Sequence, residues 1–340
     1  MAQVVPEEVV NAEPPPGCGC CIAGFGKFPK PIDTLRIEKD GGKFVRLTDG
    51  RIIEYFVYGS TKPDAKTLVQ FTGTAGTARF FCSSVKYTTK LKELNIRGIG
   101  ITVPGHGYSS TKVGRLIYDI NEDIKPIFEA ENVDTFIVEG TSYGSSHALA
   151  LAHYFGKAGK VEAMHLHVPY VSKAVAVAEG LSNDGTSSML QVSTANLQTC
   201  SSCHYFCCAS CAFKCMNWCL SSTYDDPDLP ESGALQAEDL KRCAAHSSYG
   251  IIMNAASDHA AEGWGFDPRE VKEWVSGANK VLVSYAKDDN DAPPEHGEFL
   301  GRYFEATVNA EDIGRKHDTY MARFLKGELL EQLVGLMQGA

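Results

Sequence analysis

A serine between two glycines is the residue best placed to do chemistry. Residues 140–144 read Gly-Thr-Ser-Tyr-Gly, a G-x-S-x-G pattern. Residues 133–139 before it are rich in β-branched and aromatic side chains, whereas residues 145–152 after it are rich in good helix formers. A strand that turns sharply into a helix at a serine exposes the hydroxyl at a corner, and the helix N-terminus faces developing negative charge. We therefore predict that Ser142 is a nucleophile.

A serine hydroxyl needs a base within hydrogen-bond reach, and that base needs an orienting carboxylate. Asp289 lies in a carboxylate-rich segment, residues 287–293, directly after an apolar run typical of a strand. His317 follows 28 residues later. That length fits one helix, one strand and a turn, which would return the chain to the same edge of a sheet. We predict Asp289 as the acid and His317 as the base, with Asp288 as the alternative acid.

The elements that must position these residues alternate along the chain. Residues 67–167 alternate between strand-like and helix-like runs, which predicts a parallel sheet covered by helices on both faces. Ligands bind such sheets at the carboxyl ends of the strands, where Ser142 lies. The expected strands are 43–47 and 51–58 as a hairpin, then 67–71, 97–103, the run into Ser142, 161–167, 280–285 and 306–309. The expected helices lead up to Leu94 and then span about 116–130, 294–304 and 320–337.

The chain divides into a core, an insertion and an N-terminal extension. Residues 1–30 contain three consecutive prolines and scattered glycines, so we expect a disordered or loosely attached segment. Residues 31–180 and 263–340 form the expected α/β core. Residues 181–262 contain no clear strand, which predicts a Cys-rich helical cap inserted into the core.

Several motifs together resemble the α/β-hydrolase fold superfamily, in its esterase and lipase-like group. Residues 72–76, Thr-Gly-Thr-Ala-Gly, resemble its His-Gly-x oxyanion loop, with Thr72 at the histidine. Residues 104–109, Pro-Gly-His-Gly-Tyr-Ser, resemble its Pro-Gly-x-Gly-x-Ser turn. Residues 286–293 resemble its Gly-x-x-Asp-x-x-x-Pro acid loop, which favours Asp289 over Asp288. The order nucleophile, acid, base is also that of the α/β-hydrolases. The resemblance implies a mostly parallel central sheet flanked by helices.

The resemblance also implies a function, that of a serine hydrolase cleaving an ester or thioester of a small-molecule acyl substrate. Ser142 would attack the carbonyl, His317 would move the protons and Asp289 would stabilise the imidazolium. The backbone N–H groups of Thr74 and Tyr143 would form the oxyanion hole. This chemistry needs no cofactor and no metal. Two alternatives stay open: a non-catalytic ligand-binding or scaffold protein on the same fold, and an acyltransferase.

The remaining histidines are weaker candidates for the base. His296 lies within an expected helix and His259 within the insertion. His165 and His167 share one face of an expected strand, which is typical of packed or edge residues. His106 lies in the loop that follows the strand 97–103, near the expected site, and is a candidate substrate contact.

Twelve cysteines, seven of them within residues 200–219, form a second group of reactive side chains. On an ideal helix those seven thiols would fall within an arc of about 160° but spread along about 28 Å, too far for one metal site. This favours a thiol-lined packing face over a zinc site. The C-x-x-C-H run at 200–204 matches the haem-attachment pattern, but covalent haem is disfavoured without an export signal. S-acylation or redox sensitivity is the main alternative. Cys18, Cys20 and Cys21 are better S-acylation candidates, and their modification would associate the protein with a membrane.

Charge and hydropathy exclude other classes. The formal net charge is −10 and no Lys/Arg run occurs, which argues against a nucleic-acid binder. No apolar run approaches the roughly 18 to 20 residues of a transmembrane segment. The N-terminus lacks the basic and apolar regions of a secretory signal, so the cysteines indicate reduced thiols in a cytoplasmic protein. The insertion carries nine acidic and three basic residues, which disfavours a strongly anionic substrate.

Overall fold

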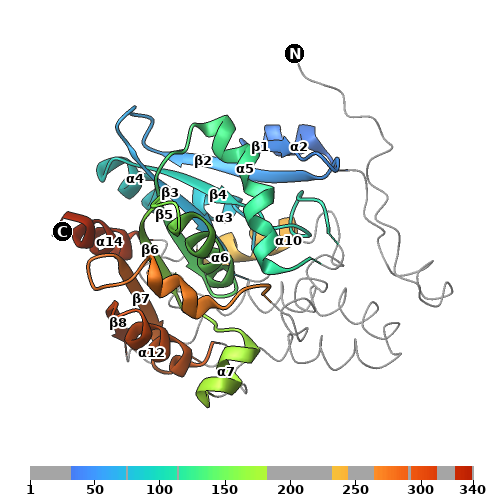
Figure 1. The fold of residues 1–340 in the computed structure, drawn as a ribbon. Coiled ribbons are helices and arrows are strands. Elements are labelled where there is room, and N and C mark those ends of the chain that lie inside the picture. The colour runs from blue at the N-terminus through green and yellow to red at the C-terminus, as the bar shows by residue number, and fades with distance from the viewer. Residues whose placement is uncertain are drawn as a thin grey trace, which may run out of the picture.

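The described part of the chain builds one eight-stranded sheet in the order β1-β2-β4-β3-β5-β6-β7-β8 (Figure 1). The computed structural model describes residues 32–73, 76–112, 115–181, 232–243, 264–289, 292–311 and 326–338. Strands β1 (Lys43–Arg46) and β2 (Ile52–Gly59) form the predicted hairpin, and β2 also pairs antiparallel with β4. The other strands run parallel to one another: β3 (Lys66–Phe71), β4 (Ile96–Ile101), β5 (Phe136–Thr141), β6 (Val161–His167), β7 (Val281–Ala286) and β8 (Thr307–Glu311). The predicted mostly parallel sheet is confirmed.

Helices cover both faces of this sheet and bury a separate apolar cluster on each (Figure 1). The helices packed in the larger cluster are α5 (Ile120–Glu131), α6 (Gly144–Gly156), α7 (Lys173–Glu179), α12 (Pro294–Tyr303) and the 3-10 helices η2 (Ile117–Asp119) and η3 (Pro268–Glu273). Those packed in the smaller one are α3 (Arg79–Ser83), α4 (Val85–Glu93) and α14 (Glu328–Gln338), with α10 (Ser232–Cys243) against it through Leu235. The remaining described helix is α2 (Thr34–Lys39).

The centre of the sheet is buried on both sides, which explains the continuous apolar runs in the sequence. All six residues of β5 are buried, as are all six of β7. Strand β5 leads directly into α6, and twelve of the thirteen residues of this helix are buried. The segment around Ser142 therefore joins two of the most deeply buried elements, so its backbone has little freedom to move.

The last helix begins later than the sequence predicts. We expected a helix from about residue 320, but Lys326 and Gly327 form a turn and α14 begins at Glu328. Gly327 has a φ of +76°, a left-handed conformation that interrupts an α-helix. The short helix α2 was not predicted, since six residues carry too little periodicity to identify.

Several predictions fall on residues outside the described ranges. These are the N-terminal segment 1–30 with its three cysteines, the cysteine cluster at 200–219, Thr74 and His317. Of the expected cap, the structure describes Leu181 and the helix α10. Among the described helices, none combines the length and the apolar character that crossing a bilayer requires.

Candidate active site

Ser142 sits at a strained turn between β5 and α6. Its φ is +53°, a left-handed conformation that non-glycine residues rarely adopt and that clusters at functional sites. Hydrogen bonds hold it there: the Ser142 N–H donates to the carbonyl of His167 at 2.8 Å, and the Ser145 hydroxyl and N–H donate to the carbonyl of Ser142 at 2.6 and 2.9 Å. This is the strand–turn–helix geometry that the G-x-S-x-G pattern predicts.

The two glycines of the motif are required by close backbone contacts. A Cβ on Gly140 would lie 2.3 Å from the carbonyl oxygen of Gly144. A Cβ on Gly144 would lie 2.4 Å from the carbonyl oxygen of Phe71, at the end of β3. Both distances are far below van der Waals contact, so only glycine lets α6 start this close to the sheet.

Ser145 is a contributor to this turn that the sequence analysis missed. Besides donating to Ser142, its hydroxyl accepts from the Tyr170 N–H at 3.0 Å, in the segment that follows β6. It thus ties the nucleophile's turn to the neighbouring strand connection. A serine in the first turn of a helix is a weak signal by itself, because such residues more often bond only to their own helix.

Of the two residues predicted to form the oxyanion hole, the structure describes Tyr143. Tyr143 is the residue before α6, so its backbone N–H lies at the N-terminus of that helix. Thr74 lies outside the described residues, but its neighbour Gly73 runs against the nucleophile. A Cβ on Gly73 would stand 3.0 Å from Cβ and 3.4 Å from Oγ of Ser142. The loop after β3 therefore passes directly beside the serine.

The two candidate acids differ in their surroundings. Asp288 is exposed, whereas Asp289 is buried and its Oδ1 accepts from the Ala292 N–H at 2.9 Å. Both follow β7, which is separated from β5 only by β6. Because these three strands are parallel, Asp289 and Ser142 lie at the same edge of the sheet. The geometry favours Asp289, as the motif does.

The path to the predicted base follows the expected course as far as it is described. Helix α12 and strand β8 come after Asp289, and β8 runs parallel to β7. The Lys287 N–H donates to the Glu311 carbonyl at 2.8 Å, so the end of β8 lies at the carboxyl edge of β7. The chain thus returns to the predicted edge six residues before His317, whose role stays a prediction.

His106 is deep inside the protein, beside two groups that the sequence did not single out. Burial and the positive charge of Arg115 lower the pKa of His106 to about 3. His147 of α6 is fully buried as well, and burial with the same arginine holds its pKa well below the usual range. The Arg115 Nη2 lies 3.3 Å from Nε2 of His147, whose ring meets that of Tyr143 edge-on at 5.0 Å. Both imidazoles are neutral at pH 7, and a substrate contact by His106 stays a prediction.

His165 and His167 of β6 are packed, as expected, and His296 is buried as well. His165 has its Nδ1 2.7 Å from Glu139 Oε2 and its Nε2 3.0 Å from the Ser284 hydroxyl, entirely inside the sheet. His167 packs next to it, with ring centroids 5.7 Å apart. His296 of α12 is buried, and its Nδ1 accepts from the Val171 N–H at 3.3 Å.

A second strained residue lies at the same edge. Val168 follows β6 with a φ of +42°, which is a marked outlier for a β-branched side chain. Its N–H donates to the Ser284 carbonyl at 2.7 Å. Strained backbone thus occurs at the ends of two adjacent strands, after β5 and after β6.

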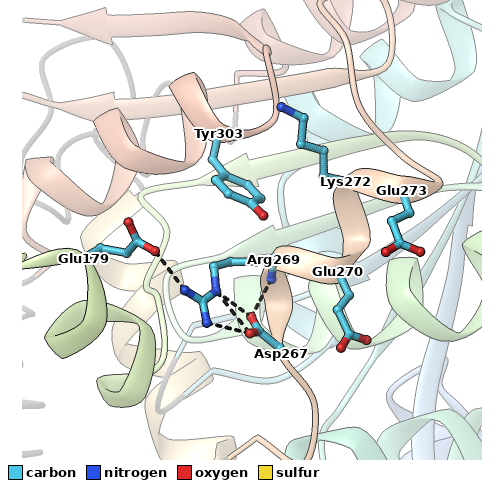
Figure 2. A pocket seen from close by; sticks show the side chains of 7 residues that line it. All are labelled: Glu179, Asp267, Arg269, Glu270, Lys272, Glu273 and Tyr303. Atoms are coloured by element: carbon cyan, nitrogen blue, oxygen red, sulfur yellow. Dashed lines mark hydrogen bonds and ion pairs between the residues drawn. The ribbon is translucent and has the colours of Figure 1, made fainter.

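An open surface pocket of about 460 Å³ lies elsewhere, between α7, η3 and α12 (Figure 2). Figure 2 shows Arg269 bonded to Asp267 and Glu179, with the closest ion-pair distances at 2.7 and 2.9 Å. The lining is mostly charged and half-buried or exposed. It includes none of the predicted catalytic residues: Glu179, Asp267, Arg269, Glu270, Lys272, Glu273 and Tyr303. We interpret it as a solvated ion-pair surface.

The described residues offer no metal centre. Within the ranges that the structure describes, no three His, Cys, Asp or Glu side chains gather as metal ligands would.

Comparison with known proteins identifies the architecture. No protein-family model and no curated protein matches the chain. Among solved structures, an enol-lactonase from Burkholderia xenovorans LB400 aligns with a TM-score of 0.64 at 15% identity, covering 87% of this chain and 100% of that one. A bromoperoxidase from Bacillus anthracis gives 0.62 at 15%, covering 87% and 99%. An esterase from Rhodococcus sp. ECU1013 gives 0.60 at 17%, also covering 87% and 99%. These likenesses confirm the fold that the sequence predicts.

Proposed function

We propose that this chain, which has the α/β-hydrolase fold, is a serine hydrolase that cleaves a small carboxylic ester or thioester through an acyl-enzyme on Ser142. The observation that carries the proposal is the left-handed Ser142 at the start of α6, held by Ser145 and flanked by glycines that nothing larger can replace. A strained turn of this kind, kept against its conformational cost, supports a role in chemistry over a role in packing.

The proposed reaction follows from these positions. Ser142 Oγ attacks the substrate carbonyl carbon while His317 accepts the hydroxyl proton, and Asp289 stabilises the imidazolium. The oxyanion accepts hydrogen bonds from the N–H groups of Tyr143 and Thr74, each able to lower the barrier by roughly 3 to 4 kcal/mol. His317 then gives its proton to the leaving alcohol or thiol. Water, activated by the same imidazole, releases the acid and restores the serine.

The compared structures support an ester-like substrate. One is an enol-lactonase and another an esterase, and the lactone and ester groups share the carbonyl that a serine nucleophile attacks. We further propose that segment 181–262 caps the pocket and selects the acyl group. A reducing, cytoplasmic setting fits the two described cysteines, Cys82 and Cys243, which are free thiols.

Hydrolysis of p-nitrophenyl esters of increasing chain length tests the proposal. We expect turnover of at least one ester, and a loss of about 10⁴-fold or more in kcat on changing Ser142→Ala. A hydrolase releases the free acid as its product. If added alcohols or thiols are acylated in preference to water, the protein is an acyltransferase. A folded protein that turns over none of the esters, or an S142A variant as active as the wild type, would rule the function out.

A further inference from the structure

Helix α10 of the insertion is docked on the core through one face. Leu235, Glu238, Asp239 and Arg242 are spaced i, i+3, i+4 and i+7, so they share one side of the helix. Leu235 packs against the smaller apolar cluster, and Glu238 pairs with Arg79 of α3 at 2.5 Å. The helix therefore lies beside α3, directly after the loop that follows β3.

Asp239 accepts hydrogen bonds from the end of that loop through both of its carboxylate oxygens. Its Oδ2 accepts from the Thr77 N–H at 2.8 Å, and its Oδ1 accepts from the Thr77 hydroxyl. Asp239 is only 8% exposed and Thr77 is fully buried. A buried carboxylate with two donors from a single residue fixes that residue in both position and orientation.

The other end of the same loop touches the nucleophile. Gly73 runs against Ser142, and the Gly76 N–H donates to the Gly73 carbonyl at 3.1 Å. A Cβ on Gly76 would lie 2.8 Å from the Cβ of Thr72, so the loop also folds tightly on itself. The loop thus spans from Ser142 to the anchor that Asp239 provides.

Arg242 secures α10 independently of this contact. Its guanidinium pairs with Asp40 and with the fully buried Glu54, and it stacks 4.8 Å from the ring centroid of Tyr108. The carbonyl of Cys243 accepts from the Gly107 N–H at 2.9 Å, in the turn after β4. None of these contacts involves Thr77, so we expect α10 to stay docked when the bond from Asp239 to Thr77 is removed.

We propose that Asp239 is a positioning residue for catalysis. It fixes Thr77 and, through the hydrogen bond between Gly76 and Gly73, the stretch of chain beside Ser142, so that the proposed oxyanion donors keep their position. The insertion thereby takes part in the chemistry. This inference rests on the proposed serine hydrolase function and adds a residue to its machinery. An oxyanion donor must stand within about 2.7 to 3.1 Å of the developing charge, so a small drift of the loop has a large effect on kcat.

The test compares Asp239→Ala and Asp239→Asn with Glu238→Ala as the matched control. Glu238 lies on the same face, but its side chain is 60% exposed. For each protein we would measure kcat and KM on p-nitrophenyl acetate, the rate of labelling by a fluorophosphonate, and the unfolding temperature. The expected result for D239A is a kcat lower by about 10- to 100-fold with KM within about threefold, while E238A stays within about twofold in both.

The asparagine variant separates positioning from structural damage. Its amide oxygen still accepts from the Thr77 N–H and its amide N–H can donate to the Thr77 hydroxyl, so D239N should recover most of the lost kcat. If D239A does not fold, Thr77→Val serves in its place, because it removes the hydroxyl contact and keeps the β-branched shape. We expect T77V to lower kcat by about 3- to 10-fold.

The outcomes distinguish this inference from the function beneath it. A wild type that is labelled at Ser142, with a D239A variant of unchanged kcat and labelling rate, overturns the role of Asp239 and leaves the hydrolase intact. A loss confined to KM or to the unfolding temperature overturns it as well. A wild type that neither turns over ester nor takes the label overturns the function, and this inference with it.

Discussion

At the residue scale, the two adjacent carboxylates after β7 have opposite surroundings. Asp289 is buried and orients itself through the Ala292 N–H, whereas Asp288 is exposed. Only a carboxylate fixed in this way can hold an imidazole in one orientation. We expect Asp289→Asn to lower kcat by about 10³- to 10⁴-fold, and Asp288→Asn to change it by about threefold or less. Steady-state kinetics on one ester decides, and equal losses would refute the assignment.

His106 makes the fold sensitive to acid. Burial lowers its pKa to about 3 from 6.5, so between these values the unfolded chain binds a proton that the folded protein excludes. A depressed histidine pKa means that stability is complete above pH 6.5 and falls as the pH drops toward 3. The loss attributable to His106 is about 3 kcal/mol at pH 4.5 relative to pH 7.5.

Urea unfolding of wild type and His106→Gln at the two pH values measures this effect. The glutamine variant should lose about 3 kcal/mol less on acidification, whatever its stability at pH 7.5. His147 titrates in the same direction and remains in both proteins, so the difference between them reports His106 together with its effect on His147. Identical pH dependence in the two proteins would show that His106 is not held neutral by burial.

At the element scale, the start of α6 depends on a glycine that packing requires. Changing Gly144→Ala would bring a methyl group within 2.4 Å of the Phe71 carbonyl, so we expect a destabilisation of about 3 kcal/mol or more together with lost activity. Gly335→Ala in α14 is the matched control, because a Cβ there meets nothing within 4 Å. It should be neutral or stabilise by up to about 1 kcal/mol, as expected for alanine in a helix. Chemical denaturation of both variants checks the contrast, and a tolerated G144A would mean that α6 can move away from the sheet.

The elements were largely predictable from the sequence because burial on both faces leaves a strong pattern. Strands β5 and β7 lie in largely apolar runs, and the turn residues Thr48-Asp49-Gly50 indicate the hairpin of β1 and β2. The turn at Ser142 followed from its glycines. The contact between Asp239 and Thr77 could not be predicted from the sequence, because the two residues lie 162 positions apart and no local pattern joins them. The helix expected from about residue 320 is interrupted by the turn at Lys326 and Gly327, because the left-handed glycine also fits a helical run in the sequence.

At the scale of the whole molecule, a buried polar row crosses the smaller-cluster face of the sheet. Tyr58 donates to Gln70 Oε1 at 2.5 Å, the Gln70 amide donates to Glu139, and Glu139 meets His165, which reaches Ser284. The row links β2, β3, β5, β6 and β7. Gly98 of β4 leaves the space for it, since a Cβ there would stand 2.2 Å from the Tyr58 ring. Side chains of five strands thus form one buried hydrogen-bond network.

Removing the middle of this row should destabilise the whole fold. In Glu139→Ala, the buried amide of Gln70 and the ring of His165 both lose a partner, which costs about 3 to 5 kcal/mol. Glu162→Ala is the control, because its pairing with Lys66 is at the surface and contributes at most about 1 kcal/mol. Equilibrium unfolding separates the two, and an E139A variant no less stable than E162A would show that the row is not a stabilising network.

The central claim is that Ser142 is the nucleophile of a serine hydrolase, and covalent labelling tests it most directly. The folded protein would be incubated with a fluorophosphonate, its intact mass measured and the modified peptide sequenced by mass spectrometry. We expect a single adduct on Ser142, absent in Ser142→Ala and formed more slowly in Asp289→Asn. If the folded protein forms no adduct, or forms it on another residue, Ser142 is not the nucleophile.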